Sequence, residues 1–480
     1  MTETDSFLRL SPIPPSTSAI MPRSVPNPMT ATERRAAASL AGIFGLRMLG
    51  MFLILPVFAL YAATLPGGDN HTLVGLALGM YGLTQALLMI PFGMASDRFG
   101  RKPVIIVGLL IFALGSFLAA QADDLWGVLL GRALQGAGAI SAAVTALLAD
   151  LTREEKRTQA MAMIGSTIGL AFAFSLAASP VFYRWIGVPG MFALTGVLAL
   201  LAILVVKFVT PDPGKTAFHS DAETNPARLK DVVRLPELLR LNWGIFALHA
   251  AQMAMFIVVP FALVDGGLDA QHHWQVYLPV LLVSLIILVP AIIYGEKHGG
   301  LKNVFVAAIA LMLAAQIGLA FSMHEFWGVV AALFAYFVAF NILEASLPSL
   351  VSKIAPPEAK GTAMGVYNTS QALGLFFGAA AGGWLAQNHG YGAVFAFCSG
   401  LMAVWLLLAI RMTPPPRVKT QMFHIGALSP QDAQRLATRL TVFAGVEAVT
   451  VLPEEGSVLL KVAQTGWDEE GIRHLLQGGH

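Results

Sequence analysis

Residues 93–102 read GMASDRFGRK, and they lie between two long apolar runs. The run before them is TLVGLALGMYGLTQALLMIPF, and the run after them is PVIIVGLLIFALGSFLAA. Each run is long enough to cross a bilayer as a helix, since a hydrocarbon core of about 30 Å needs roughly 20 residues. The quoted stretch is therefore a short connection between two spans, and it mixes one acid, Asp97, with the bases Arg98, Arg101 and Lys102.

The composition extends this conclusion to the whole chain. Of its 480 residues, 56% are hydrophobic and 12% are charged, whereas soluble domains carry about 25% charged residues. So few charges cannot cover the surface of a water-soluble fold, so the expected class is an all-α integral membrane protein. The single cysteine, Cys398, excludes an intrachain disulfide and a metal site built from several cysteines. We expect no metal and no cofactor.

The apolar runs predict twelve spans in two six-helix halves, at 37–210 and 240–412. Residues 1–36 are rich in Pro, Ser and Thr, too polar for a signal peptide, and are expected to be a disordered tail. A polar linker at 211–239 ends in a segment with the pattern of a surface amphipathic helix. The expected spans are 37–62, 73–95, 103–121, 125–149, 158–182, 190–209, 240–264, 275–295, 303–323, 325–351, 361–386 and 390–412.

The basic residues orient these spans. They gather in the loops after every second span, whereas the loops on the other side contain only Arg184. By the positive-inside rule, the basic loops and both termini are cytoplasmic. The chain is thus expected to cross a membrane many times, with lipid as a partner and no nucleic acid.

The residue types in 93–102 suit a role beyond that of a plain connection. Gly93 has no side chain, so a neighbouring helix can pack closely on it. Asp97 follows one turn later on the same helix face and can pair with Arg101. Gly100 permits a turn with unusual dihedrals. The stretch therefore predicts a turn that holds an ion pair beside a close helix contact.

A simpler alternative is a topology marker, because any tight cytoplasmic loop tends to be basic and to contain glycine. Arg98 and Lys102 fit that alternative, since both can bind anionic headgroups. A plain basic loop does not need an acid, however. A faded copy in the second half, EKHGG at 296–300, keeps an acid in the same place. The acid therefore favours a functional role for this loop over a topology marker alone.

These features together resemble the major facilitator superfamily. The stretch 93–102 is similar to its signature loop, and GRALQG at 131–136 is similar to its pattern R-x-x-Q-G. The halves also repeat, since RTQAMAMIGSTIGL at 157–170 is similar to KGTAMGVYNTSQALG at 360–374. The resemblance implies a major facilitator fold, a location in a bacterial-type inner membrane, alternating access, and a small-molecule substrate bound between the halves. It also implies that Asp150 joins Asp97 and Arg101 in a conformational latch.

The antiporter branch of this superfamily carries a glycine-rich run that ends in Gly-Pro. Here the run GSTIGLAFAFSLAASP at 165–180 keeps its proline but has Ser179 before it. We expect a proton-coupled exporter of small amphipathic compounds, with protons as partners and a monomer as the assembly. The chain has no Walker A pattern and no catalytic constellation, so neither ATP drive nor an enzyme is expected. A proton symporter or uniporter for a sugar or metabolite, and a membrane sensor with a ligand-binding tail, remain alternatives.

Three charged residues lie well inside expected spans, away from the span ends, and are candidates for proton coupling: Arg47, Arg132 and Glu344. Arg132 could instead extend to the nearer membrane surface. Glu344 could instead form a structural pair with Arg47 or another base. Polar side chains within spans are candidates for the substrate cavity, although each could be a simple helix–helix hydrogen bond. They are Gln85, Gln135, His249, Gln252, Asn341, Tyr367, Asn368 and Gln371.

The chain after residue 412 has a soluble composition. A stiff Pro-rich linker at 413–420 precedes a domain at 421–480 with the predicted order β-α-β-β-α. This order is close to a ferredoxin-like α+β fold that lacks its last strand. Metal-carrying domains of that kind use a C-x-x-C loop, which is absent here, so the tail is expected to sense a small ligand, dimerise, or stabilise the cytoplasmic face. With this tail, the chain resembles the YajR-type transporters of the superfamily.

Overall fold

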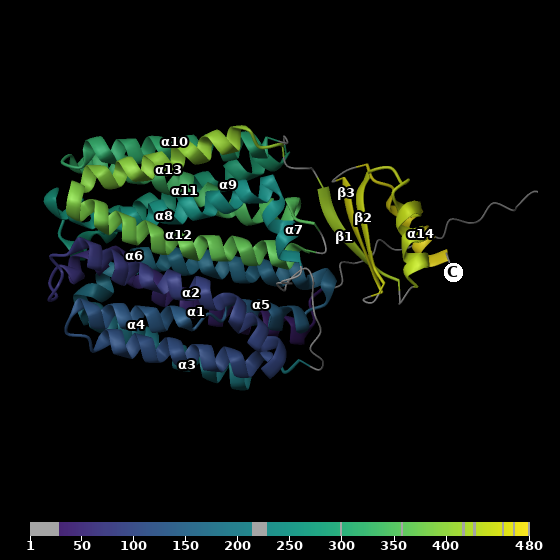
Figure 1. Ribbon diagram of the computed structural model, residues 1–480, viewed down its shortest axis with the longest axis horizontal. Helices are drawn as coiled ribbons and strands as arrows, with labels where there is room; N and C mark the ends of the chain where they lie inside the picture. Colours follow the sequence, from purple (N-terminus) through teal and green to yellow (C-terminus); the bar gives the residue numbers. More distant parts are fainter. Residues whose placement is uncertain are drawn as a thin grey trace, which may run out of the picture.

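The computed structural model describes residues 28–213, 228–297, 300–356, 359–414, 418–425, 429–453, 456–463 and 466–478. A bundle of long helices carries a small domain of strands and helices at one end (Figure 1). We call this end of the bundle the domain end and the opposite end the far end. Most of the expected disordered tail (1–27), much of the long linker (214–227) and part of the short linker (415–417) lie outside the described residues.

The first half contains six long helical segments, and one of them has a break that the expected spans missed. The expected span 125–149 is two helices, because Gly138 at φ −73°, ψ 53° interrupts the chain. The expected spans 158–182 and 190–209 follow one another in α6 and are separated by a kink at Gly187, whose φ of 63° is not helical. This kink lies in the expected connection between the two spans. The elements are α1 (Ala31–Ala62), α2 (His71–Phe99), α3 (Arg101–Ala120), α4 (Leu125–Ala137), α5 (Ser141–Asp150), α6 (Glu154–Leu204) and the π-helix η1 (Val205–Val209).

The second half matches its expected spans more closely. The expected amphipathic helix of the linker is reduced to the six residues of α7, because Leu235 is extended before the next helix begins. The elements are α7 (Leu229–Arg234), α8 (Pro236–Asp265), η3 (Ala270–His272), α9 (Trp274–Lys297), α10 (Leu301–Ser322), α11 (Phe326–Ile354), α12 (Lys360–His389) and α13 (Tyr391–Ile410).

The described part of the chain has ten helical segments that are long and apolar enough to cross a membrane. Two features separate this number from the expected twelve. The two sides of Gly187 count as one segment, and α12 is not among the ten although it has 30 residues. Glycine and polar residues such as Thr362, Asn368 and Gln371 lower the hydropathy of α12. The bundle thus has ten to twelve apolar helices.

The first helix starts within the expected disordered tail. Thr30 and Glu33 form a capping box, in which the Thr30 hydroxyl accepts from the Glu33 amide and the Glu33 carboxylate accepts from the Thr30 amide. This pair satisfies two donors that a helix end leaves open. Helix α1 therefore begins at Ala31, six residues before the expected start of the first span.

The two halves are closely packed at the far end, where α2 meets α12. A Cβ added to Gly75 would lie 2.2 Å from the Ala379 carbonyl oxygen, and one added to Gly383 would lie 2.3 Å from the His71 oxygen. Only glycine allows backbones this near. The His71 amide also donates to Gln387 Oε1 at 2.7 Å. The far end is therefore closed by backbone-to-backbone contact between the halves.

The domain beyond the bundle is a three-stranded antiparallel sheet with the order β1-β3-β2. Its elements are β1 (Val418–His424), α14 (Pro430–Leu440), β2 (Val446–Leu452), β3 (Ser457–Ala463) and α15 (Glu469–Gly478). Strand β1 starts inside the expected linker 413–420, because Val418 pairs with the last residue of β3.

The residues of β3 alternate between two environments, as the period of a strand requires. Val458, Leu460 and Val462 are buried in the small core with Leu440 and Ile472 from the helices. Lys461, between them in sequence, donates to the carbonyl oxygens of residues 353 and 355 at the end of α11. One face of the sheet thus holds its own core, and the other contacts the bundle.

Candidate functional site

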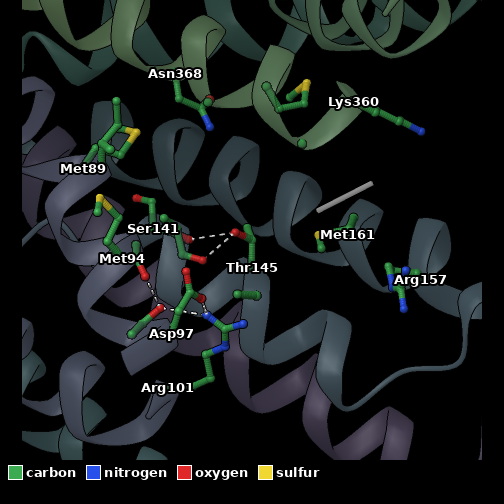
Figure 2. Close-up of a pocket in the computed structure, with 18 of the residues that line it drawn as sticks. Met89, Met94, Asp97, Arg101, Ser141, Thr145, Arg157, Met161, Lys360 and Asn368 are labelled. Carbon is green, nitrogen blue, oxygen red and sulfur yellow. Dashed lines mark hydrogen bonds and ion pairs between the residues drawn. The ribbon is translucent and has the colours of Figure 1, made fainter. Parts of the chain in front are cut away.

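A cavity of about 290 Å³ lies between the two halves at the domain end. Helices α2, α5 and α6 line one side and α11 and α12 the other, with Asn368 and Lys360 facing Met94 and Thr145 across it (Figure 2). Its wall mixes thioethers and small apolar side chains with hydroxyls. The lining residues are Met89, Ile90, Gly93, Met94, Ser96, Asp97, Arg101, Ser141, Ala142, Thr145, Ala146, Arg157, Met161, Pro348, Ser352, Lys360, Gly361, Met364, Gly365 and Asn368.

The ion pairs expected from the signature loop are present beside this cavity. The Arg101 side chain is 2% exposed, and it contacts Asp97 and Asp150. Its Nε lies 3.2 Å from Asp150 Oδ2, and its Nη1 donates to Ser96 Oγ at 3.0 Å. The two acids differ in exposure, because the Asp150 side chain is fully buried and that of Asp97 is 52% exposed. One guanidinium thus joins α2, α3 and α5.

The other residues of the signature loop serve the turn and its surroundings. Gly100 has a φ of 91°, so the expected need for glycine in this turn is confirmed. Lys102 Nζ contacts the Thr210 carbonyl oxygen and Asp212 Oδ1, each at 2.6 Å, and so ties α3 to the chain after η1. Arg98 is exposed and lies over the Phe99 ring.

Gly93 is not closely packed in this structure. A Cβ added there would meet only the Ala142 side chain, at 3.4 Å, an ordinary contact distance. The expected close approach of a neighbouring helix to Gly93 is absent, because the cavity separates α2 from α11 at this level. Room for a side chain therefore exists at Gly93.

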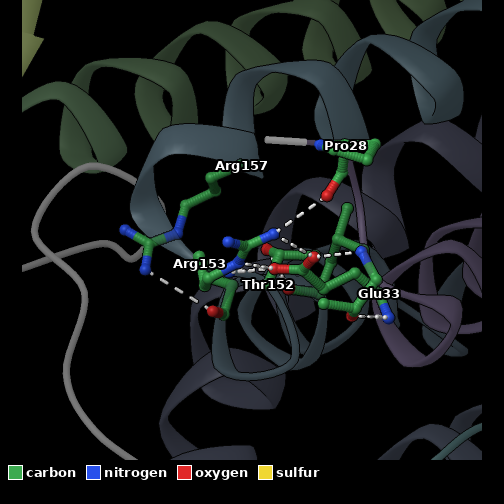
Figure 3. A network of polar contacts seen from close by, with 8 residues as sticks. Pro28, Glu33, Thr152, Arg153 and Arg157 are labelled. Atoms are coloured by element: carbon green, nitrogen blue, oxygen red, sulfur yellow. Dashed lines mark hydrogen bonds and ion pairs between the residues drawn. The ribbon is translucent and has the colours of Figure 1, made fainter. Parts of the chain in front are cut away.

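A second polar network closes the first half at the domain end (Figure 3). Arg153, just before α6, donates from Nε to Glu33 Oε1 at 2.8 Å and from Nη2 to Glu33 Oε2 at 2.9 Å. It also donates to the Pro28 carbonyl oxygen. Glu33 is 5% exposed, so this pair holds the start of α1 against the connection between α5 and α6.

Replacing Arg153 by methionine is expected to destabilise the protein by about 2 kcal/mol, because Glu33 would lose its charged hydrogen bonds while remaining buried. The measurement is thermal unfolding of the purified protein in detergent. The control is Arg435→Met, which removes an 80% exposed side chain 3.9 Å from Asp432. Equal melting temperatures for the two variants would contradict this role of the Glu33–Arg153 pair.

Arg132 does not extend to the membrane surface, contrary to one of the alternatives. It is 2% exposed and donates to Gln135 Oε1 at 3.0 Å and to the Leu78 carbonyl oxygen at 3.3 Å. Gln135 in turn donates to Ser116 Oγ at 2.8 Å. Gln135 thus connects α4 to α3, and it is not among the residues that line the cavity.

Glu344 lies beside a base in the second half, but that base is not Arg47. Its Oε2 is 3.8 Å from His249 Nε2, and that nitrogen is 2.8 Å from Gln371 Nε2. Arg47 instead donates to Ser141 Oγ at 3.0 Å. The alternative in which Arg47 pairs with Glu344 is therefore wrong, and the acid belongs to a cluster with His249 and Gln371.

Some of the remaining cavity candidates line a cavity, and others form a helix–helix hydrogen bond. Asn368 lines the large cavity, and Gln252 lines a second, smaller one. Asn341 donates to Ser284 Oγ at 2.8 Å and so joins α11 to α9 as a plain helix–helix hydrogen bond. Gln85 Oε1 and the Tyr367 hydroxyl are buried and have no hydrogen-bond partner in the part of the chain that the structure describes.

Sequence reasoning missed Tyr81, Ser96 and Ser141. Tyr81 lies next to two arginines, with its ring centroid 5.7 Å from Arg47 Cζ and 4.9 Å from Arg132 Cζ. Ser96 and Ser141 accept hydrogen bonds from buried guanidinium groups. Ser96 could have been found, because it lies inside the signature loop. The other two come together only through tertiary packing.

Comparison with known proteins places this bundle in a family. The model of the Major Facilitator Superfamily matches residues 40–295 and 269–451. The chain belongs to the major facilitator superfamily. Within it the chain is of the YajR type, since it is 43% identical over 435 residues to the inner membrane transport protein YajR of Escherichia coli (strain K12). That match covers 90% of this chain and 95% of the relative. This superfamily member is therefore a multi-pass inner-membrane transporter of bacterial type.

More distant relatives of this superfamily member agree in fold. The chain is 29% identical over 360 residues to the multidrug resistance protein MdtH of Proteus mirabilis (strain HI4320), covering 70% of this chain and 84% of the relative. The solved nucleoside transporter NupG aligns with a TM-score of 0.62 at 13% identity, over 78% of this chain and 99% of that one. A bacterial homologue of the human lysosomal transporter Spinster, solved in an inward-facing and occupied conformation, aligns with a TM-score of 0.62 at 14% identity. That alignment covers 80% of this chain and 98% of the other.

Proposed function

We propose that this transporter exports small amphipathic compounds in exchange for protons by alternating access, with twelve spans and the domain end in the cytoplasm. The asymmetry of the bundle carries the proposal. The halves meet backbone to backbone at the far end, and a cavity of about 290 Å³ separates them at the domain end. This is the arrangement of an inward-facing transporter, in which a substrate enters from one side only. The name of MdtH as a multidrug resistance protein supports the substrate class.

Alternating access requires halves that move as units, and the first half is braced for this. Arg101 joins α2, α3 and α5, Lys102 joins α3 to the chain after η1, and Arg153 joins α6 to α1. All three contacts lie at the domain end. The first half therefore presents one rigid edge to the cavity, and closure brings α11 and α12 toward that edge.

Asp97 is placed to act in that closure. It lines the cavity from α2, its partner Arg101 lies behind it, and Ser352 and Lys360 line the opposite wall. When the cavity closes, the half-exposed carboxylate meets the ends of α11 and α12. We propose that Gly93, Asp97, Arg98, Gly100, Arg101, Lys102 and Asp150 form the latch of the closed state.

Glu344 and His249 are the groups we propose for proton coupling. They are on α11 and α8, 3.8 Å apart, and Gln371 of α12 contacts the histidine. A proton bound to this cluster changes its net charge inside the second half, so its occupancy can bias the packing of these helices. Arg132 and Arg47 lie in the other half and contact neutral partners.

Proteoliposomes that contain the purified protein and a trapped pH-sensitive dye test the exchange. Added amphipathic compounds are expected to release protons from an acidic lumen, and the Glu344→Gln variant is expected to lose this response. The conservative control Asn341→Ser changes a polar residue one turn earlier on α11. Compound uptake that carries protons in the same direction would instead establish a symporter, and flux without proton movement a uniporter.

We further propose that the C-terminal domain is ferredoxin-like and lacks its fourth strand. Support comes from the element order β-α-β-β-α and the strand order β1-β3-β2. Lys461 reaches the carbonyl oxygens of residues 353 and 355 at 3.1 and 2.8 Å, so the domain contacts the end of a cavity-lining helix.

Replacing Lys461 by methionine is expected to raise hydrogen exchange at residues 351–356 severalfold, because the end of α11 loses a cationic partner for its open carbonyls. Transport is expected to persist, both in this variant and after removal of residues 418–480. The control is Arg439→Met, which removes an exposed cation from α14. Complete loss of flux on removal of the domain would favour the sensor alternative.

A further inference from the structure

Two buried arginines in the first half share one aromatic ring and lack an acidic partner. Arg47 of α1 and Arg132 of α4 are each 2% exposed, and both lie over the ring of Tyr81. Their hydrogen-bond acceptors are a serine hydroxyl, a glutamine amide oxygen and a backbone carbonyl oxygen. Within the described ranges, no carboxylate forms an ion pair with either. The centre of this half therefore holds two positive charges that no described carboxylate neutralises.

The cluster also keeps unused hydrogen-bond donors. Arg47 Nε and Nη2, Arg132 Nε and the Tyr81 hydroxyl are buried and have no partner among the described residues. Buried polar atoms are nearly always satisfied, and a buried charge is costly unless it is paired. The face of Tyr81 offsets part of that cost for both cations. The remaining donors belong to three residues grouped around one aromatic ring, and they are suited to the oxygen atoms of an anionic group.

The cluster lies on the boundary between the halves. Tyr81 and Arg132 line the smaller cavity, opposite Gln252 of α8 and Leu375 of α12. Arg47 donates a hydrogen bond to Ser141, which lines the large cavity. Along α2, Tyr81 precedes the first residue of the large cavity, Met89, by about 12 Å. The cluster is thus at the deep end of the route that the large cavity opens.

We propose that Arg47, Arg132 and Tyr81 bind the anionic group of an amphipathic substrate, a carboxylate, sulfonate or phosphate. This deepens the proposed transport function and rests on it. The smaller cavity holds only about 10 Å³ here, so the anion enters when the halves separate at this level. The apolar part of the substrate would contact Met51, Phe52 and Met253, which line the same space.

Three probes with one apolar body and different charges test this: 4-phenylbutyrate, 4-phenylbutan-1-ol and 4-phenylbutylamine. The measurement is the melting temperature of the purified full chain in detergent, because a ligand of the folded state raises it with concentration. Only the carboxylate is expected to stabilise the wild type. Arg47→Gln and Arg132→Gln are each expected to weaken its apparent affinity about tenfold or more, since each removes charged hydrogen bonds.

Arg240→Gln is the matched control, because it removes an arginine that pairs with Glu237 outside the cluster. Should Arg132→Gln fail to fold, Tyr81→Phe keeps the ring, removes one unused donor, and is expected to weaken carboxylate binding severalfold. Stabilisation by the alcohol or the amine, no stabilisation by the carboxylate, or unchanged binding in the arginine variants would overturn the proposal. Equal stabilisation by inorganic phosphate alone would reduce the site to an inorganic-anion site and reject the amphipathic substrate.

This binding measurement uses no proton gradient. Carboxylate binding without proton exchange in proteoliposomes would reject the proposed coupling and leave the anion site standing. Proton exchange that is driven by the amine and not by the carboxylate would support the proposed coupling and reject the anion site.

Discussion

Leucine in place of Gly93 is expected to reduce transport at least tenfold while the protein still folds. In the present conformation the new side chain has room, because a Cβ at this position meets only Ala142, at 3.4 Å. The side chain would extend into the cavity that closure must remove. It would therefore act as a wedge between α2 and α11. The measurements are flux in proteoliposomes and the melting temperature in detergent.

The control for this prediction lies on the same helix. Leucine at Gly75 would place its Cβ 2.2 Å from the Ala379 carbonyl oxygen, so it is expected to lower the melting temperature of this conformation sharply. Alanine at Gly93 is expected to transport measurably, since one methyl group fits. Wild-type flux in a well-folded Gly93→Leu variant would show that the cavity does not close at this level.

Asparagine in place of Asp150 is expected to destabilise the protein by about 3 kcal/mol. Asp150 and Arg101 are both buried, and removing one charge from a buried pair leaves the other without full compensation. The same substitution at Asp97 is expected to cost less than about 1 kcal/mol, because that carboxylate is half exposed. Thermal unfolding of the two variants measures the difference.

For the direct effect on gating we expect the opposite order, in which Asp97 matters more than Asp150. Asp97→Asn leaves the braced half intact but removes the charge that faces the closing helices, so flux falls in a protein of near-normal stability. Asp97→Glu, which keeps the charge, should restore part of the flux. A wild-type transport rate in normally expressed Asp97→Asn would refute the latch.

Much of the bundle could be predicted from the sequence, because long apolar runs have few alternatives in a membrane. The exceptions have local causes. Gly138 interrupts a helix without making the chain polar, so hydropathy does not report this break. The start of α1 was missed for the opposite reason, since its first turn is polar and is held by Glu33 and Arg153.

The candidate site could be predicted only where its parts are close in sequence. Asp97 and Arg101 are one helical turn apart, so their pairing follows from spacing, and Asp150 came only from a family resemblance. The residues Arg47, Tyr81 and Arg132 come from three different helices. No local pattern specifies which face of each helix meets the others. The same limit applies to Glu344, whose neighbour is His249 and not Arg47.

Distances across both ends of the bundle test the central claim, that the two ends open in alternation. Spin labels at Met94 and Ser352 span the cavity, and labels at Asp69 and Asn388 span the far end, each in a Cys398→Ala background. Double electron–electron resonance in nanodiscs, over a range of pH, should find a short cavity distance only with a long far-end distance. In Gly93→Leu, neither the short cavity distance nor the long far-end distance should be found. Far-end opening while the cavity distance stays long, or short cavity distances in Gly93→Leu, would contradict alternating access through this gate.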